Sequence, residues 1–251
     1  MKASEALFRA LAPPADFDAL LDLVPELTLS RELRQGPYHH LDTLDHTQEV
    51  VRRVERELEE GRIGARVGED HVEGLRLAAL LHDVAKPVTR GEFEGRVIFV
   101  AHDTLGARMI HGICRRLDLS AAVTDAAATL TTLHLKIGFM ANPRSDYPPE
   151  RLVRAAGPFG ESLAVLSWAD RLAAQGPRLK DEHIERHRAL CGDFLKASRR
   201  AGPHPAQDYE DVARRLGLSN CADTGYAASR ARLLASRGMG ASAALEYVRP
   251  R

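Results

Sequence analysis

Apolar residues recur at helical spacing along most of this chain. Between residues 43 and 60 they form one face of an amphipathic helix, at Thr47, Val50, Val51, Val54 and Leu58. The same periodicity predicts helices near residues 4–12, 16–24, 70–85, 102–117, 120–137 and 150–156, and from Gly160 past Arg171. A β pattern occurs near residues 88–100, where Gly91, Gly95 and the run 97–100 predict a small hairpin. We therefore expect an all-α fold with one small β-hairpin.

Breaks and changes of composition divide the chain into three regions. Pro25 ends the second predicted helix, which leaves residues 1–24 as an N-terminal helical cap. Beyond Gly176-Pro177 the composition changes to charged helices near residues 180–200, 205–216, 224–236 and 241–248. We expect a core domain over residues 25–176 and a C-terminal helical extension over residues 177–251. The pattern does not indicate a role for this extension.

Several histidines and aspartates lie on faces that the apolar pattern predicts to be buried. The pair His82-Asp83 follows the Leu- and Ala-rich run 75–81, and Asp170 stands between apolar residues of the helix that begins at Gly160. His46, His102 and His134 lie on, or at the border of, the apolar stripes of three other predicted helices. Burying such groups is costly unless each one finds a partner.

A metal centre would satisfy all of these groups at once. Neutral imidazole and ionised carboxylate are ligands that Mn, Fe, Ni or Zn ions accept. His82-Asp83 alone would fit a capped helix end, with Asp83 paired to an arginine and His82 bonded to a carbonyl. Taken together, His46, His82, Asp83, His102, His134 and Asp170 favour a dinuclear site.

Bulk composition limits the partners. The 251 residues hold 35 basic and 35 acidic side chains, so the formal net charge is zero. Such a charge balance argues against binding of extended duplex DNA but is compatible with a small phosphorylated substrate or an RNA end. Cys114, Cys191 and Cys221 form neither a disulfide framework nor a zinc spacing, and we expect all three in the core. Residues 1–17 resemble neither a signal peptide nor a membrane span, which predicts a cytoplasmic protein.

Three ordered motifs resemble the HD-domain superfamily of metal-dependent phosphohydrolases. They are Tyr38-His39-His40-Leu41-Asp42-Thr43-Leu44-Asp45-His46-Thr47, Ala78-Ala79-Leu80-Leu81-His82-Asp83-Val84-Ala85-Lys86-Pro87, and Phe99-Val100-Ala101-His102-Asp103-Thr104-Leu105-Gly106-Ala107. The nearest resemblance is to the HD domain of bacterial tRNA nucleotidyltransferases and poly(A) polymerases. It covers roughly residues 25–176 and implies an HD-type helical bundle there. Only a short stretch precedes it, without a paired-aspartate motif, so we expect no nucleotidyltransferase head and no nucleotide addition to tRNA.

The resemblance also implies a ligand set. It makes His46, His82, Asp83 and Asp170 the ligands of a first metal, with Asp83 bridging to a second metal that His102 and His134 also bind. HD proteins with one metal use only the first four. Mn²⁺ is the expected ion, with Ni²⁺, Co²⁺, Fe²⁺, Mg²⁺ or Zn²⁺ as alternatives. A hydroxide held between the metals would then attack phosphorus.

Cationic residues near these motifs are candidates for substrate contacts. Lys86 is a candidate phosphate contact or leaving-group stabiliser, and a solvated surface lysine is the alternative. Arg90, Arg108 and Arg171 are further phosphate candidates, although Arg171 could instead pair with Asp170. His39 and His40 would lie at the rim, touching substrate, capping a helix or facing water. The other histidines, at positions 71, 111, 183, 187 and 204, have no partner in the pattern.

The resemblance implies a phosphodiesterase or phosphatase that acts on nucleotides or RNA ends, including 2′,3′-cyclic phosphates, with a role in RNA processing. An HD-type nucleotidase or deoxynucleotide triphosphohydrolase is the alternative enzyme. A non-catalytic RNA- or partner-binding module is the alternative outside enzymes, and it would be favoured by lost ligands. The oligomeric state stays open.

Overall fold

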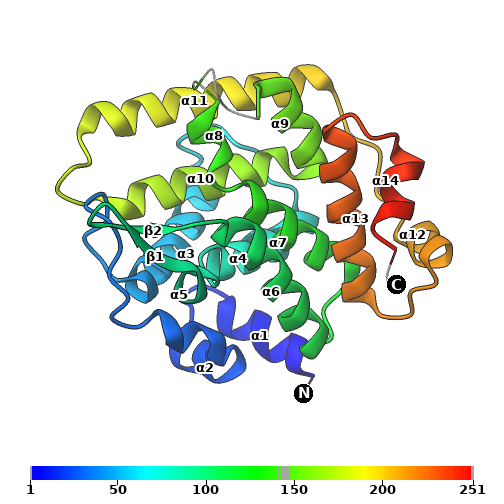
Figure 1. The fold of residues 1–251 in the computed structure, drawn as a ribbon, viewed down its shortest axis with the longest axis horizontal. Helices are drawn as coiled ribbons and strands as arrows, with labels where there is room; N and C mark the ends of the chain where they lie inside the picture. Colours follow the sequence, from blue (N-terminus) through cyan, green and yellow to red (C-terminus); the bar gives the residue numbers. More distant parts are fainter. Residues whose placement is uncertain (1, 141, 143–146, 250–251) are drawn as a thin grey trace.

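Helix α7 (Ala121–Leu133) lies at the centre of the fold and is buried along almost its whole length. Its sequence is rich in alanine and threonine, and these small side chains let neighbouring helices approach closely. Helices α4 (Glu69–Leu81), α6 (His102–Arg116) and α13 (Cys221–Ser236) all pack against it (Figure 1). Ser120 caps α7 by accepting a hydrogen bond from the Val123 amide, as its sequence predicts.

The computed structural model describes residues 2–140, 142 and 147–249. The remaining described helices are α1 (Ala3–Leu11), α2 (Phe17–Leu23), α3 (Thr43–Glu60), α5 (Lys86–Thr89), α8 (Lys136–Phe139), α9 (Pro149–Ala156), α10 (Gly160–Ala174), α11 (Asp181–Ala201), α12 (Tyr209–Leu216) and α14 (Ala241–Tyr247). Short 3₁₀ helices cover Pro25–Ser30 and Gly157–Phe159. The expected all-α class is confirmed. None of the described helices is both long enough and apolar enough to cross a bilayer.

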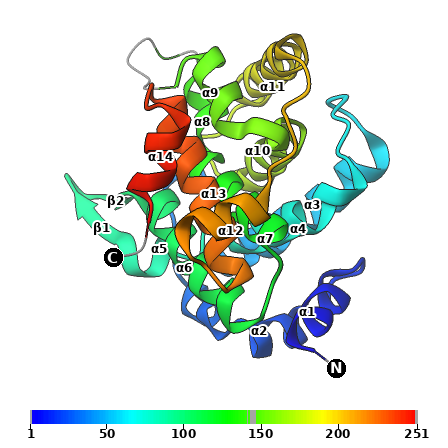
Figure 2. The same ribbon diagram turned by 90° about the vertical axis from the view of Figure 1, so that its right-hand side faces the viewer.

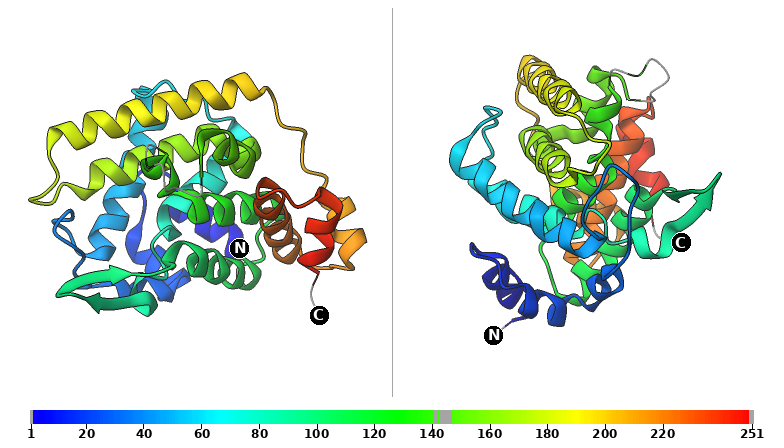
Figure 3. Two further views of the ribbon diagram at one scale, coloured as in Figure 1. Left: turned by 45° about the horizontal axis from the view of Figure 1, so that its top comes forward. Right: turned by 90° about the vertical axis from the view of Figure 1, so that its left-hand side faces the viewer.

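Two of the helices after residue 176, α11 (Asp181–Ala201) and α13, share the main core with the preceding ones. Helix α11 runs along α10 in both views of the bundle (Figures 1 and 3) and contributes Cys191, Phe194 and Leu195 to that core. Helix α13 packs on α7 so closely that a Cβ at Gly225 would meet the backbone of Ala121. Helices α12 and α14 form a smaller cluster with the outer side of α13. The boundaries at residues 24 and 176 stay a prediction.

A buried ion pair joins α13 to α7. Arg232 donates to both carboxylate oxygens of Asp125, which is fully buried, and Tyr209 of α12 donates to the same carboxylate at 3.0 Å. These two partners satisfy a charge that would otherwise be costly to bury. The docking of α13 is therefore specified by charge as well as by close packing.

The expected hairpin is confirmed. Strands β1 (Arg90–Phe93) and β2 (Arg96–Phe99) are antiparallel, with Arg90 opposite Phe99 and Phe93 opposite Arg96. The hairpin projects away from the helices (Figure 2), and Phe93 at its tip is 63% exposed. Its inner end leads directly into α6.

Two helices end earlier than the apolar periodicity predicts. The helix expected over residues 70–85 ends at Leu81 and begins at Glu69, so Asp70 lies in its first turn and Gly68 is the N-cap. The helix expected over 120–137 ends at Leu133 and restarts at Lys136. Apolar residues continue past both ends, which is why periodicity misses them. Both breaks fall at a histidine, His82 and His134.

One cysteine expectation is wrong. Cys114 and Cys191 are buried, but Cys221 is exposed. It is the first residue of α13, directly after the N-cap Asn220, where the side chain faces solvent. A position at a helix terminus carries no periodic information about burial.

Candidate metal centre

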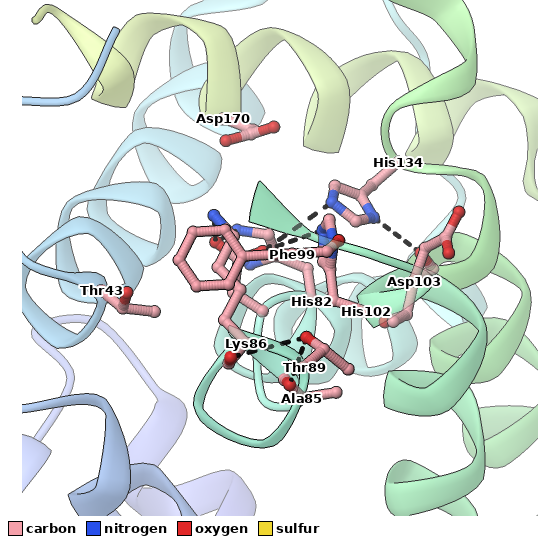
Figure 4. A network of polar contacts seen from close by, with 12 residues as sticks. Thr43, His82, Ala85, Lys86, Thr89, Phe99, His102, Asp103, His134 and Asp170 are labelled. Atoms are coloured by element: carbon pink, nitrogen blue, oxygen red, sulfur yellow. Dashed lines mark hydrogen bonds and ion pairs between the residues drawn. The ribbon is translucent and has the colours of Figure 1, made fainter. Parts of the chain in front are cut away.

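The side chains of His82, His102 and His134 lie together (Figure 4). All three converge on the carboxylate of Asp83. His82 Nε2 lies 3.2 Å from Asp83 Oδ2, while His102 Nε2 and His134 Nε2 lie 3.5 and 3.9 Å from Oδ1. His82 and His134 cap the C-termini of α4 and α7, and His102 is the first residue of α6. The early helix ends therefore place these rings around one carboxylate.

Backbone carbonyls fix the orientation of all three rings. The Nδ1 atoms of His82, His102 and His134 lie 2.9, 2.8 and 2.6 Å from the carbonyl oxygens of Ala79, Phe99 and Thr131. A carbonyl only accepts, so each Nδ1 carries the proton and donates it. In the neutral ring the lone pair of Nε2 then faces Asp83. This arrangement is typical of histidines that bind metals.

His46 and Asp170 complete the cluster on its other side. His46 is fully buried on α3, and its Nε2 lies 3.0 Å from Asp170 Oδ1 of α10 and 3.7 Å from Asp83 Oδ2. Ligand atoms within 4.8 Å of one another occur in the group His46, His82, Asp83 and in the group Asp83, His102, His134. Asp83 belongs to both groups. The helices thus bring together every residue that the sequence predicts as a ligand.

Several buried polar atoms in this cluster form no hydrogen bond with any described residue. Among the described residues, His82 Nε2, His102 Nε2 and Asp83 Oδ1 form no hydrogen bond although all three are buried. An unpaired buried polar atom costs about 1–3 kcal/mol, and three in one cluster are not explained by packing. A divalent cation would satisfy them, so the side chains present fit a metal site.

The protonation states of the two carboxylates and of His134 suit metal binding. Burial raises the pKa of Asp83, but the adjacent His82 and Lys86 outweigh it and hold the pKa well below its ordinary value. Burial likewise raises the pKa of Asp170, but its hydrogen bond with His46 outweighs this and lowers the pKa well below normal. Burial lowers the pKa of His134 to about 4. Both carboxylates are ionised and His134 is a neutral donor near pH 7.

Lys86 is buried, so the alternative of a solvated surface lysine is wrong. Its Nζ lies 2.6 Å from Asp83 Oδ2 and 2.5 Å from Gln35 Oε1, and it faces the Phe99 ring at 5.4 Å. Pro87 lies in the first turn of α5, a position that favours proline, so the helix can begin at Lys86. The ammonium compensates the charge of Asp83 at the edge of the cluster.

His39 lies closer to the cluster than a rim position implies. It is half-buried, its ring centroid is 5.1 Å from that of His46, and it forms a third group of possible ligands with His46 and Asp170. Burial, aided by Lys86, lowers the pKa of His39 to about 4. His40 is exposed, and its Nδ1 donates to the carbonyl of Ala174 at 2.9 Å. His40 therefore ties this segment to the end of α10.

The predicted arginines occupy different surroundings. Arg171 is half-buried on α10 and forms no ion pair with any described residue, so the expected alternative of a pair with Asp170 is not formed. Its Nε is buried without a hydrogen-bond partner in the described part of the chain. Arg90 on β1 and Arg108 on α6 are exposed, and no described contact joins either one to the cluster.

The sequence pattern misses two supporting side chains. Gln35 lies in a loop and holds Lys86, and Asp103 binds Lys136 Nζ at 2.7 Å, which links the start of α6 to α8. Asp103 directly follows His102 in one of the three motifs, so its position in the sequence could have indicated a supporting role. Gln35 is a lone polar residue in a polar stretch and gives no signal.

The chain is similar in sequence to known proteins. The chain matches the HD domain family over residues 38–175. It is 33% identical over 205 residues to the A-adding tRNA nucleotidyltransferase of Deinococcus radiodurans, covering 80% of this chain and 44% of that protein. It is 30% identical over 208 residues to the CC-adding tRNA nucleotidyltransferase of Thermus thermophilus, covering 81% of this chain and 43% of that protein. The chain thus spans less than half the length of these relatives.

Proposed function

The chain belongs to the HD domain family, and we propose that it is a metal-dependent phosphohydrolase that acts on nucleotides or RNA ends, including 2′,3′-cyclic phosphates. The observation that carries this proposal is the pair of ligand groups that share Asp83. Two adjacent positions with a common carboxylate are typical of dinuclear phosphoester hydrolysis.

We assign the ligands from the two groups. His46, His82, Asp83 and Asp170 would hold a first ion, and Asp83, His102 and His134 a second. The mixture of imidazole and carboxylate suits Mn²⁺, Fe²⁺, Co²⁺, Ni²⁺ or Zn²⁺ better than Mg²⁺, and Mn²⁺ is the ion we propose. The His39 group supplies a further donor next to the first position.

When bound, divalent ions supply an acidified water and polarise the phosphoryl oxygens. The chain's own residues orient the ligand atoms and compensate the charge of the cluster. The carbonyls of Ala79, Phe99 and Thr131 hold the imidazole donors in place. Lys86 brings a positive charge to the edge of the cluster, which suits a phosphoryl or leaving oxygen. Arg90, Arg108, Arg171 and His40 stay predictions for substrate contacts.

The relatives bear on the substrate. Both are named as enzymes that add nucleotides to tRNA, which favours RNA ends among the phosphorylated substrates we propose for this chain. A zero net charge favours short ends or mononucleotides over long polymers. The role in RNA processing and the cytoplasmic location are part of this proposal.

The test combines metal analysis with a substrate panel. Elemental analysis of the purified chain should find transition metal, and the metal-loaded chain should hydrolyse bis-p-nitrophenyl phosphate and nucleoside 2′,3′-cyclic phosphates. The panel includes nucleoside 2′-, 3′- and 5′-phosphates and deoxynucleoside triphosphates, so preference for a 5′-phosphate or a triphosphate would identify the alternative enzyme. Tight metal binding without turnover of any substrate would favour the non-catalytic module.

A further inference from the structure

A cationic pocket adjoins the candidate metal centre. It is an open cavity of about 650 Å³ between α8, α10, α11 and the segment around His39. This volume falls within the roughly 300–1,000 Å³ typical of small-molecule sites. His39 lines the pocket, and its ring also packs nearly perpendicular to that of His46. One imidazole therefore separates the pocket from the cluster.

Two arginines dominate the described lining of this pocket. Arg171, Arg186 and His183 line it, and no carboxylate does so among the described residues. Neither arginine forms an ion pair in the described part of the chain, and Arg171 Nε is buried without a partner. Arg171 is half-buried, whereas Arg186 is exposed. A half-buried guanidinium without a counter-ion is costly, and an anionic ligand would compensate its charge.

His187 gives the pocket a hydrogen-bond acceptor. The ring is buried, and its Nε2 lies 3.1 Å from the carbonyl oxygen of Ser167, which fixes the proton on Nε2. Burial, aided by Arg171, lowers the pKa of His187 to about 4, so the ring is neutral. A Cβ at Gly138 would lie 3.7 Å from His187 Nδ1 and 4.0 Å from Arg171 Nη2. Glycine thus leaves this corner open to a ligand.

We propose that this pocket is a phosphate subsite that binds the 5′-phosphate of a nucleotide whose 2′,3′-cyclic phosphate lies at the metal centre. The inference rests on the proposed function. The arginines would bind the phosphate, and His187 Nδ1 would accept from a hydroxyl or amine of the ligand. One sugar ring separates the two phosphates, as one imidazole separates the two sites. The substrate class is therefore 5′-phosphorylated, as is the last nucleotide of an RNA chain.

The kinetic test compares cytidine 2′,3′-cyclic phosphate with its 5′-phosphorylated form on the metal-loaded chain. The second phosphate should raise kcat/KM about tenfold, since it adds charge-assisted hydrogen bonds. Arg186→Gln should bring the ratio of the two kcat/KM values close to one. Arg188→Gln is the matched control, because Arg188 is exposed on the same helix but does not line the pocket. An equal ratio in wild type, or a loss shared by Arg188→Gln, overturns the subsite.

A binding test separates this inference from the proposed function. Calorimetry on the chelator-treated chain should show that cytidine 5′-monophosphate binds about tenfold tighter than cytidine, and that Arg186→Gln removes the difference. Gly138→Met, which fills the open corner, should weaken the same binding. If these results hold while no cyclic phosphate is hydrolysed, the proposed function fails and the subsite stands. If hydrolysis occurs without any preference for the 5′-phosphate, the subsite fails and the function stands.

Discussion

Asp83 is the residue that both groups of candidate ligands share. It lies within 4 Å of His46, His82, His102, His134 and Lys86. No other described side chain belongs to both the group with His46 and His82 and the group with His102 and His134. The arrangement therefore predicts that changes at Asp83 affect both metal positions, while changes at a histidine affect one position more than the other.

Asp83→Ala and Asp83→Asn should abolish hydrolysis of every substrate and keep the helical circular dichroism of the wild type. Both changes remove the shared charged ligand, and asparagine keeps its shape so that Lys86 and the histidines stay packed. Asp22→Asn, an exposed change on α2, is the control. Wild-type turnover by either Asp83 variant at saturating Mn²⁺ would place the active site elsewhere.

His134→Ala and His46→Ala should differ in metal content. His134 belongs only to the group with Asp83 and His102, so its loss should leave about one tightly bound ion per chain and most phosphodiesterase activity should disappear. His46 belongs to two groups, and its loss should strip the first ion and leave Asp170 without its partner, which lowers the melting temperature as well. Elemental analysis measures the metal content, and thermal melts with and without chelator measure the change in stability. Full activity in His134→Ala would indicate a mononuclear enzyme.

The elements themselves are largely predictable from the sequence, but their ends are not. Apolar spacing predicts the existence of every long helix, and the glycine and β-branched pattern predicts the hairpin. The ends at Leu81 and Leu133 depend on His82 and His134 donating to carbonyls three residues earlier, which spacing does not encode. These ends matter because they place the ligands.

Gly225→Ala should destabilise the chain by about 1–3 kcal/mol, because a Cβ there would lie closer than 3.0 Å to the Ala121 carbonyl of α7. Gly192→Ala on α11 is the matched control, since a Cβ there meets nothing within 4 Å. The control should be neutral or more stable by up to about 1 kcal/mol, as expected for glycine in a helix. Urea unfolding measures both. Equal stability of the two variants would mean that α13 does not pack tightly on the core.

At the scale of the whole molecule, the ligands are predictable and the pocket beside them is not. Each ligand is a polar residue on an apolar stripe, which the sequence shows directly. The pocket joins Arg171 of α10 to Arg186 and His187 of α11, and no local spacing links these two helices. His187 has no partner in the sequence pattern, although its ring is buried against Ser167.

The chelator-treated chain should lose stability as the pH falls from about 6.5 to 4. His39, His134 and His187 have folded pKa values of about 4, below the ordinary histidine value of about 6.5, so the unfolded chain binds more protons across this range. Asp83 and Asp170, with depressed pKa values, add a further loss below about 4. His82, whose pKa is raised, opposes this but is a single group. Thermal melts across this pH range test the direction of the change in stability. A melting temperature that rises on acidification would contradict the prediction.

The position of the β-hairpin links local opening of the fold to metal binding at His102. Phe99, the last residue of β2, provides the carbonyl that orients His102 and the ring that covers Lys86. A two-stranded ribbon that projects into solvent opens locally at small free-energy cost, and each opening would release His102. Ion binding at His102 is thereby linked to closure of the ribbon. Hydrogen exchange of the amides of residues 90–99 should slow when metal is added, while exchange in α13 should not change; equal exchange in the ribbon with and without metal would contradict this linkage.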